Sequence, residues 1–169
     1  IAVIKANAYG HGMVPVAQHL SHVDAFAVAR VTEAIELREH GITAKIILLA
    51  GVMTTAELAI AVQHGFEPVV HSAEQLDLLD ACSDGAVDAW LKFDTGMNRL
   101  GFDPADAERL MARLRASPGV GALRLMTHLA SADETENPVT DEQVRRFAAV
   151  TRGFDGDVSF ANSPGLLGW

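Results

Sequence analysis

Short apolar runs alternate with longer amphipathic segments along the whole chain. Mostly apolar runs of about four to eight residues are typical of strands covered on both faces of a sheet, and segments with helical spacing of apolar residues separate them. The pattern predicts strands at residues 1–5, 25–29, 45–50, 68–71, 87–94, 122–128 and 158–161.

Helix-start signals fall between these predicted strands. Three starts have the spacing of a capping box, in which Ser or Thr is followed three residues later by Glu or Gln. They are Thr54 with Glu57, Ser72 with Gln75, and Thr140 with Gln143. Thr32 and Asp103 are expected to be N-caps of two further helices, and Ser163-Pro164 opens another. Strand, loop and helix repeating at even spacing predict a parallel sheet with helical crossovers.

The repeat predicts an α/β fold. Seven strands favour a (β/α)8 TIM-type barrel truncated to about seven strands, and a doubly wound open sheet is the structural alternative. In such a barrel the chemistry collects at the carboxyl ends of the strands. Polar residues stand at those ends in this chain, which favours the barrel; they are Lys5, Asp94, His128 and Asn162.

The strand at 87–94 alternates between two kinds of residue. One face is apolar and is expected to meet the helices, whereas the other face carries Asp88, Trp90, Lys92 and Asp94 and is expected to line the barrel interior. Lys92 therefore lies near the mouth of the barrel, in the space that Lys5 is expected to enter.

Composition narrows the classes of partner. The 169 residues carry a net charge of −9 without a Lys or Arg cluster, so we expect no nucleic-acid partner and no anionic membrane. No apolar run reaches the ~18 residues of a membrane span. Cys82 stands alone, which argues against a disulfide framework or thiolate metal site and favours a cytoplasmic location. The chain begins within a strand and without Met, so we expect a fragment with no visible signal peptide.

Lys5 ends an apolar run and is followed by turn-forming residues, Asn7, Gly10 and Gly12. Burial disfavours the ammonium form of a lysine and populates the neutral amine, which condenses with aldehydes such as that of pyridoxal phosphate (PLP). The structural alternative is a strand-end lysine that extends to water.

Four stretches resemble bacterial alanine racemases, in the order in which that family carries them. VIKANAYGHG at 3–12 is similar to the family's PLP-lysine signature, and LKFDTGMNRLGF at 91–102 is similar to a second family segment. THLASADE at 127–134 and ANS at 161–163 resemble two further segments. The chain is thus similar to the amino-terminal barrel domain of that family.

The resemblance implies a PLP-dependent enzyme that interconverts L- and D-alanine and supplies D-alanine for peptidoglycan. It implies that PLP is attached to Lys5, which also serves as a base, and that Tyr9 and Ser163 contact its phosphate near Asn162. It further implies that Arg99 bonds the phenolic oxygen of PLP and lies near the substrate carboxylate. Lys92 is implied to be carbamylated and to orient Arg99, and His128 to support an arginine at the pyridine nitrogen.

The residues themselves leave structural alternatives open. Lys92 fits an interior pair with Asp94 or Arg99, and His128 fits a hydrogen-bonded barrel histidine. A metal site at His128, Asp133 and Glu134 has no helical spacing behind it, so no metal is expected.

The segment ANS at 161–163 and the triplet Asp94-Thr95-Gly96 have alternatives of their own. Asn162 or Ser163 fits simple helix capping, whereas a serine before free backbone N–H groups also suits a phosphate. Asp94-Thr95-Gly96 matches the triplet of aspartic proteases, but those are all-β enzymes and the match is three residues long.

The family's remaining parts are expected outside these residues. They are the helix before the first strand, the last barrel strand, the arginine at the pyridine nitrogen, and a carboxyl-terminal β domain. That domain is implied to supply an opposite-face tyrosine from the partner subunit of a homodimer with shared active sites. The alternative functions are a non-catalytic PLP-binding barrel protein, or a racemase acting on serine or on several amino acids.

Overall fold

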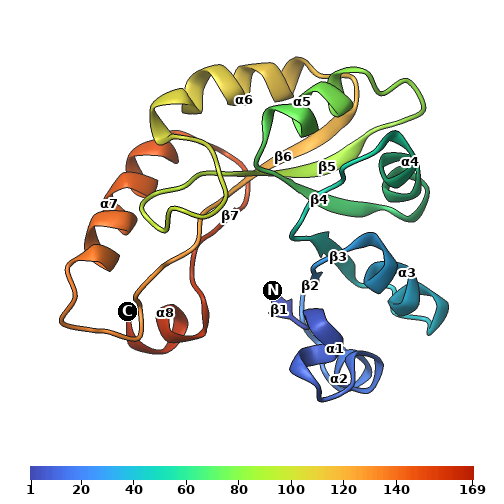
Figure 1. Ribbon diagram of the computed structural model, residues 1–169, viewed down its shortest axis with the longest axis horizontal. Helices are drawn as coiled ribbons and strands as arrows, with labels where there is room; N and C mark the ends of the chain where they lie inside the picture. The colour runs from blue at the N-terminus through green and yellow to red at the C-terminus, as the bar shows by residue number, and fades with distance from the viewer.

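Seven parallel strands form one curled sheet in the computed structural model, which describes residues 1–169. Each strand pairs with the next along the chain, so the spatial order is the sequence order (Figure 1). A doubly wound sheet reverses its strand order at a switch point, so the observed order excludes that alternative. The strands are β1 Ala2–Val3, β2 Ala25–Val28, β3 Lys45–Leu48, β4 Phe66–Val70, β5 Val87–Lys92, β6 Val120–Met126 and β7 Val158–Ser159.

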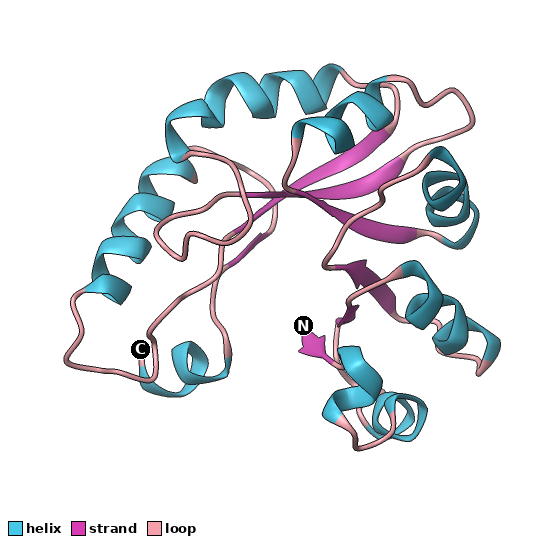
Figure 2. Ribbon diagram, in the orientation of Figure 1, coloured by secondary structure: helices cyan, strands magenta, loops and turns pink.

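Helices follow the strands and cover the outer side of the curl, whereas the inner side stays open below (Figure 2). The helices are α1 Lys5–Tyr9, α2 Met13–His19, α3 Val31–Glu39, α4 Thr55–His64, α5 Ala73–Asp80, the 3₁₀ turn η1 Pro104–Asp106, α6 Ala107–Ala116, α7 Val139–Val150 and α8 Ser163–Gly168. No helix combines the length and apolar character that a membrane crossing requires.

The alternation of side chains along β5 divides the core into two layers. Leu91 and Phe93 belong to the large apolar cluster between sheet and helices. Trp90 instead joins a small cluster on the inner side with Met126 and residues of β2, β3 and β4. The prediction that one face of this strand meets the helices and the other lines the interior is confirmed.

Two of the five capping predictions are confirmed. Thr54 Oγ1 accepts the N–H of Glu57 at 3.2 Å, while Glu57 Oε2 accepts that of Met53 at 2.7 Å. Asp103 accepts the N–H of Ala105 at 2.8 Å, with Pro104 at the first helical position. Both sites place a short acceptor before free backbone donors, as helix starts require.

The other helix starts differ from the prediction. Ser72 precedes α5 but makes no capping hydrogen bond, although Gln75 accepts the N–H of His71 at 2.8 Å. Thr32 lies within α3, which begins at Val31 and is capped by a side chain described below. In each case the side chain at the third helical position accepts an N–H group at or just before the helix start, and the predicted hydroxyl makes no capping hydrogen bond.

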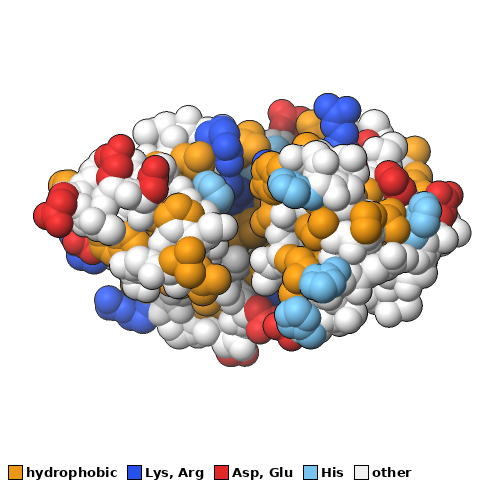
Figure 3. Space-filling model, turned by 90° about the horizontal axis from the view of Figure 1, so that it is seen from below, with side chains coloured by type: hydrophobic (Ala, Val, Ile, Leu, Met, Phe, Trp, Pro, Cys, Tyr) orange, Lys and Arg blue, Asp and Glu red, His pale blue; other side chains and the backbone are white.

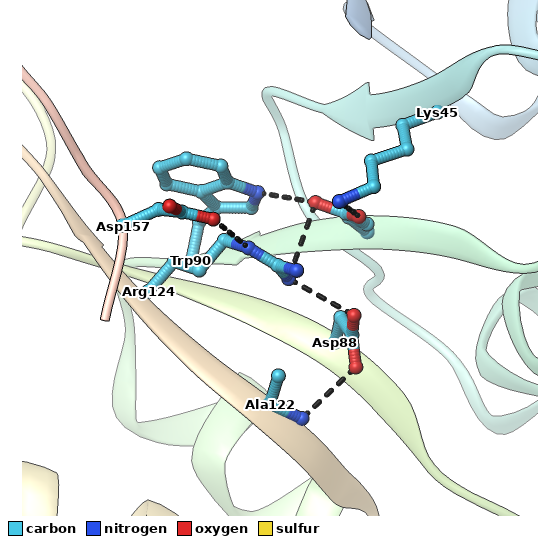
Figure 4. Close-up of polar contacts among 7 residues, drawn as sticks. Lys45, Asp88, Trp90, Ala122, Arg124 and Asp157 are labelled. Carbon is cyan, nitrogen blue, oxygen red and sulfur yellow. Dashed lines mark hydrogen bonds and ion pairs between the residues drawn. The ribbon is translucent and has the colours of Figure 1, made fainter. Parts of the chain in front are cut away.

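A charged cluster lies inside the curl, toward the amino-terminal ends of the strands (Figure 4). Arg124 is 8% exposed, and its guanidinium contacts carboxylate oxygens of Asp88 at 3.0 Å, Asp157 at 3.1 Å and Glu67 at 3.5 Å. Trp90 lies beneath that guanidinium and donates its indole N–H to Glu67 at 2.7 Å. The guanidinium of Arg124, on β6, therefore contacts residues of β4 and β5 and the residue that precedes β7.

The cluster also sets the protonation of Asp88. Burial acts to raise the pKa of this carboxyl, but hydrogen bonds from the backbone N–H of Ala122 and from the Arg124 guanidinium outweigh it, so the pKa is lowered. The carboxylate form is thus the folded-state form near neutral pH.

We expect Arg124→Met to lower the free energy of unfolding by about 3 kcal/mol, because it leaves the buried carboxyl of Glu67 with Lys45, at 3.9 Å and largely exposed, as its remaining cationic partner. Arg113→Met is the matched control: Arg113 also contacts two carboxylates, Asp77 and Asp80, but at the surface. Its loss should cost less than about 1 kcal/mol. Denaturant unfolding of both variants measures the difference, and equal losses would contradict a special role for the interior cluster.

Candidate functional site

Four basic side chains converge at the carboxyl ends of the strands. Lys5 follows β1, Lys92 ends β5, Arg99 lies on the loop after β5, and His128 follows β6. Their proximity is evident in their electrostatic effects, since Lys5 and Arg99 both act on Lys92 and on His128. Seen from below, the hollow at the centre of the molecule holds Lys and Arg side chains with a histidine beside them (Figure 3).

The concentration of positive charge changes two of these groups. Burial lowers the pKa of Lys92, and the charges of Arg99 and Lys5 lower it further, against an opposing effect of Asp94. Burial also lowers the pKa of His128, as do the charges of Lys92, Arg99 and Lys5. The site therefore favours a neutral imidazole and an unusually large share of neutral lysine amine.

Asp94 stabilises the loop that carries Arg99. Its carboxylate accepts the backbone N–H groups of Gly96 at 2.9 Å, Asn98 at 3.0 Å and Arg99 at 3.1 Å. These bonds lower the pKa of Asp94, although burial acts to raise it. Asp94 is therefore bound to the loop, and it does not form the simple interior pair with Lys92 that the sequence left open.

The same loop closes on the strand that it leaves. Phe102 donates its N–H to the carbonyl of Lys92 at 2.9 Å, and the N–H of Asp94 donates to the carbonyl of Phe102 at 2.9 Å. Gly101 lies at the closing point with φ of +130°, where a Cβ would come within 2.6 Å of the Asp94 nitrogen. Only glycine fits, and Arg99 is held by a loop anchored at both ends.

Buried hydrogen bonds from α7 join the ends of β5 and β6. Gln143, 1% exposed, donates to the Thr95 hydroxyl at 3.3 Å and the His128 carbonyl at 3.0 Å, and accepts the Ala130 N–H at 2.8 Å. The predicted capping box of Thr140 with Gln143 is wrong, because α7 already begins at Val139 and Gln143 faces the strand ends. The amide fixes the loop of Arg99 relative to His128.

The Lys5 segment is a left-handed turn. We expected a strand to residue 5, but β1 ends at Val3, and Ala6, Asn7, Ala8 and Tyr9 have φ between +51° and +55°. Each residue other than glycine in this left-handed conformation raises the free energy of the folded state by roughly 1–2 kcal/mol. Asn7 helps to stabilise the turn, since its side chain accepts the N–H of Met13 at 2.8 Å.

The expected phosphate contacts lie on either side of the open part of the sheet, on α1 and α8 (Figure 1). Tyr9 is 62% exposed. Asn162 caps α8 by accepting the N–H of Gly165 at 3.0 Å, and donates to the carbonyl of Leu129 at 3.2 Å. Ser163 is exposed at the first position of α8. The capping alternative for Asn162 is thus observed, and Ser163 itself makes no cap.

His128, Asp133 and Glu134 do not come together as ligands of a metal ion. A cavity of about 440 Å³ lies elsewhere, between the loop at 95–98 and the start of α7. Its lining includes none of the four basic residues, so the cavity and the basic site are separate features.

The family model described as alanine racemase, N-terminal domain, matches residues 1–169. The chain therefore belongs to the alanine racemase family. An alanine racemase from an Azoarcus species is 50% identical over 171 residues, which is all of this chain and 48% of that protein. A relative from Pseudomonas aeruginosa, named alanine racemase, catabolic, is 46% identical with the same coverage.

Solved structures agree with this assignment. The biosynthetic alanine racemase from Pseudomonas aeruginosa matches with a TM-score of 0.91 and 44% identity, over 99% of this chain and 47% of that one. The enzyme from Corynebacterium glutamicum matches with a TM-score of 0.86 and 32% identity, over 99% of this chain and 50% of that one. The prediction of a partial TIM-type barrel is confirmed. The chain spans about half the length of the curated relatives it matches.

We expect Lys92 to become reactive at lower pH than an ordinary lysine, because burial and the neighbouring charges lower its pKa. Competitive labelling with an amine acylating reagent across a pH series, in buffer free of carbon dioxide so that Lys92 carries a free amine, measures the half-point for each lysine by mass spectrometry. Lys45, whose side chain is 56% exposed, is the internal control. A Lys92 half-point at or above that of Lys45 would contradict the electrostatic description of the site.

Proposed function

We propose that residues 1–169 are the PLP-binding barrel domain of an alanine racemase that interconverts L- and D-alanine. The helix before β1, the closing strand and a carboxyl-terminal β domain lie outside these residues in this proposal. The observation that carries it is the convergence of Lys5, Lys92, Arg99 and His128 at the mouth of a barrel that belongs to the alanine racemase family.

The donor set fits PLP. PLP carries a phosphate and a phenolic oxygen, both negative near neutral pH, and the site offers four basic groups while Asp94, the acidic group beside them, binds backbone N–H groups. Bound PLP supplies an electron sink that makes the α-proton of an amino acid acidic. Lys5 is the residue that would hold it covalently.

The remaining residues divide between holding and orienting. Tyr9 and Ser163 are proposed to bind the phosphate, with Asn162 fixing the start of α8. Arg99 is proposed to bind the phenolic oxygen and to attract the alanine carboxylate, since a guanidinium forms strong charge-assisted hydrogen bonds. His128, neutral by burial, is proposed to support the arginine at the pyridine nitrogen.

Lys92 is proposed to be carbamylated. Carbamylation requires a neutral amine, and the lowered pKa of Lys92 supports its presence. The modification replaces a cation with an anion, so it removes the repulsion between Lys92 and Arg99 and provides an acceptor that orients the guanidinium.

Racemisation needs an acid–base group on each face of the alanine Cα. Lys5 is proposed to move the proton on one face. Tyr9 is the single tyrosine of the chain and is assigned to the phosphate, so the opposite-face group is proposed to be a tyrosine from the partner subunit's β domain. The enzyme is thus proposed to be a cytoplasmic homodimer that supplies D-alanine for peptidoglycan.

We expect borohydride reduction of the complete gene product to leave PLP bonded to Lys5, because this amine lies at the mouth beside the other basic groups. Peptide mass spectrometry locates the adduct, and Lys5→Arg should remove both the adduct and D-alanine formation. Lys45→Arg, at the amino end of β3, is the control and should retain both. An adduct on Lys92 or Lys45 instead would refute the assignment of Lys5.

Residues 1–169 expressed alone with added PLP should give no D-alanine from L-alanine, because the opposite-face base is proposed to lie outside them. The complete gene product assayed in parallel is the control, with L-serine as a second substrate to test for broader specificity. Turnover by the segment near that of the complete product would show that Tyr9 or His128 takes the role of the second base.

A further inference from the structure

The Lys5 turn depends on a side chain from another βα unit. Glu33, in the first turn of α3, accepts the backbone N–H of Ala6 on Oε1 at 2.8 Å. Its other oxygen, Oε2, accepts the N–H groups of Ala29 at 2.6 Å and Arg30 at 3.1 Å. One carboxylate therefore bonds both the end of β2 and the peptide that follows Lys5.

The N–H of Ala6 has lost its partner in the sheet. The pairing of β1 with β2 ends where the N–H of Ile4 donates to the carbonyl of Ala27 at 2.9 Å. The next carbonyl along that ladder, Ala29, accepts instead the N–H of Ala50, from the β3 side, at 3.1 Å. The left-handed turn thus leaves Ala6 with a free donor, and the Glu33 carboxylate binds it.

The neighbouring units show which part of this arrangement is general. Glu57 and Gln75 occupy the same third position of α4 and α5, and each accepts the N–H of the residue before the N-cap, at 2.7 Å and 2.8 Å. Gln75 also reaches the preceding strand end, but there its amide donates to the carbonyl of Ala50 at 2.9 Å. The helix-start contact is therefore shared by all three side chains.

The contact with Ala6 is specific to Glu33. The chain presents a donor at Ala6 and donors at Ala29 and Arg30, so the side chain must accept on both of its oxygens. A carboxylate can do this, whereas an amide has one acceptor and one donor end. The third position of α3 thus requires an acid, whereas α5 has an amide at the equivalent position.

We infer that Glu33 is a positioning residue for Lys5: by holding the Lys5–Ala6 peptide in the left-handed turn, it sets where the Lys5 amine lies at the barrel mouth. This inference rests on the proposed function, in which that amine holds PLP and moves a proton. Glu33 acts through the backbone and does not touch the reacting atoms.

The test is Glu33→Gln in the complete gene product, with Glu57→Gln as the matched control. Both side chains are half-buried at the same helical position, but only Glu33 contacts the Lys5 turn. A glutamine at position 33 keeps an acceptor for α3 and loses the one for Ala6. We expect the Ala6 amide to exchange with solvent at least ~10-fold faster, as measured by peptide hydrogen exchange, because its hydrogen bond is removed.

The same variant should attach added PLP to Lys5 more slowly and reduce kcat by on the order of 10-fold, with KM for alanine within about twofold, because misplacement of a reacting group slows the step it performs. Glu57→Gln should leave the Ala6 exchange rate, the rate of PLP attachment, kcat and KM within about twofold of the parent values. If Glu33→Gln does not fold, Glu33→Asp replaces it, since the shorter acid keeps the local contacts of α3 and withdraws from Ala6.

Unchanged exchange at Ala6, or unchanged PLP attachment and kcat alongside faster exchange, would overturn the inference and leave the proposed function standing. A parent protein with no PLP on Lys5 would refute the proposed function, and the positioning role with it.

Discussion

Backbone N–H groups bound by carboxylates are the constraint on which the mouth of this barrel depends. Asp94 holds three such groups and with them the loop of Arg99, and Glu33 holds three more around the Lys5 turn. Each carboxylate is fixed by three backbone donors at once. Basic side chains can therefore converge without a carboxylate neutralising each of them, and the site stays open to an anionic ligand.

Such convergence is unfavourable in isolation, because like charges repel and burial removes their hydration. The free energy that offsets this repulsion comes from the large apolar layer between sheet and helices. That layer contains buried residues in or next to each of the strands β1 to β6, and it contains none of the four basic side chains. The buried amide of Gln143, on α7, then fixes the ends of β5 and β6 through its hydrogen bonds to Thr95 and His128. Stability and reactivity thus come from different layers of the same fold.

The sequence predicted the strands and their parallel arrangement, because the pattern of apolar residues reflects which positions are buried in the sheet. Four motifs and the position of polar residues after strands pointed to Lys5, Lys92, Arg99 and His128, which the structure brings together at the strand ends; their roles stay predictions. The sequence did not predict the left-handed turn, since alanine at Ala6 and Ala8 gives no signal for positive φ. It also did not predict the roles of Glu33 and Gln143, because Glu33 binds Ala6, 27 residues away, and Gln143 binds Thr95, 48 residues away. The start of β4 was missed because Glu67 and Pro68 are poor strand formers, although Glu67 is buried against Arg124 and Trp90.

The cluster around Arg124 gives the barrel a filled floor. Glu67, Trp90 and Arg124 are 5%, 5% and 8% exposed, and the small apolar cluster lies with them on the inner side of the sheet. The basic residues at the mouth are thereby separated from those that hold the interior strands together. Over evolution, such a barrel can exchange side chains at its rim, and with them its specificity, while the floor continues to specify the same curvature of the sheet.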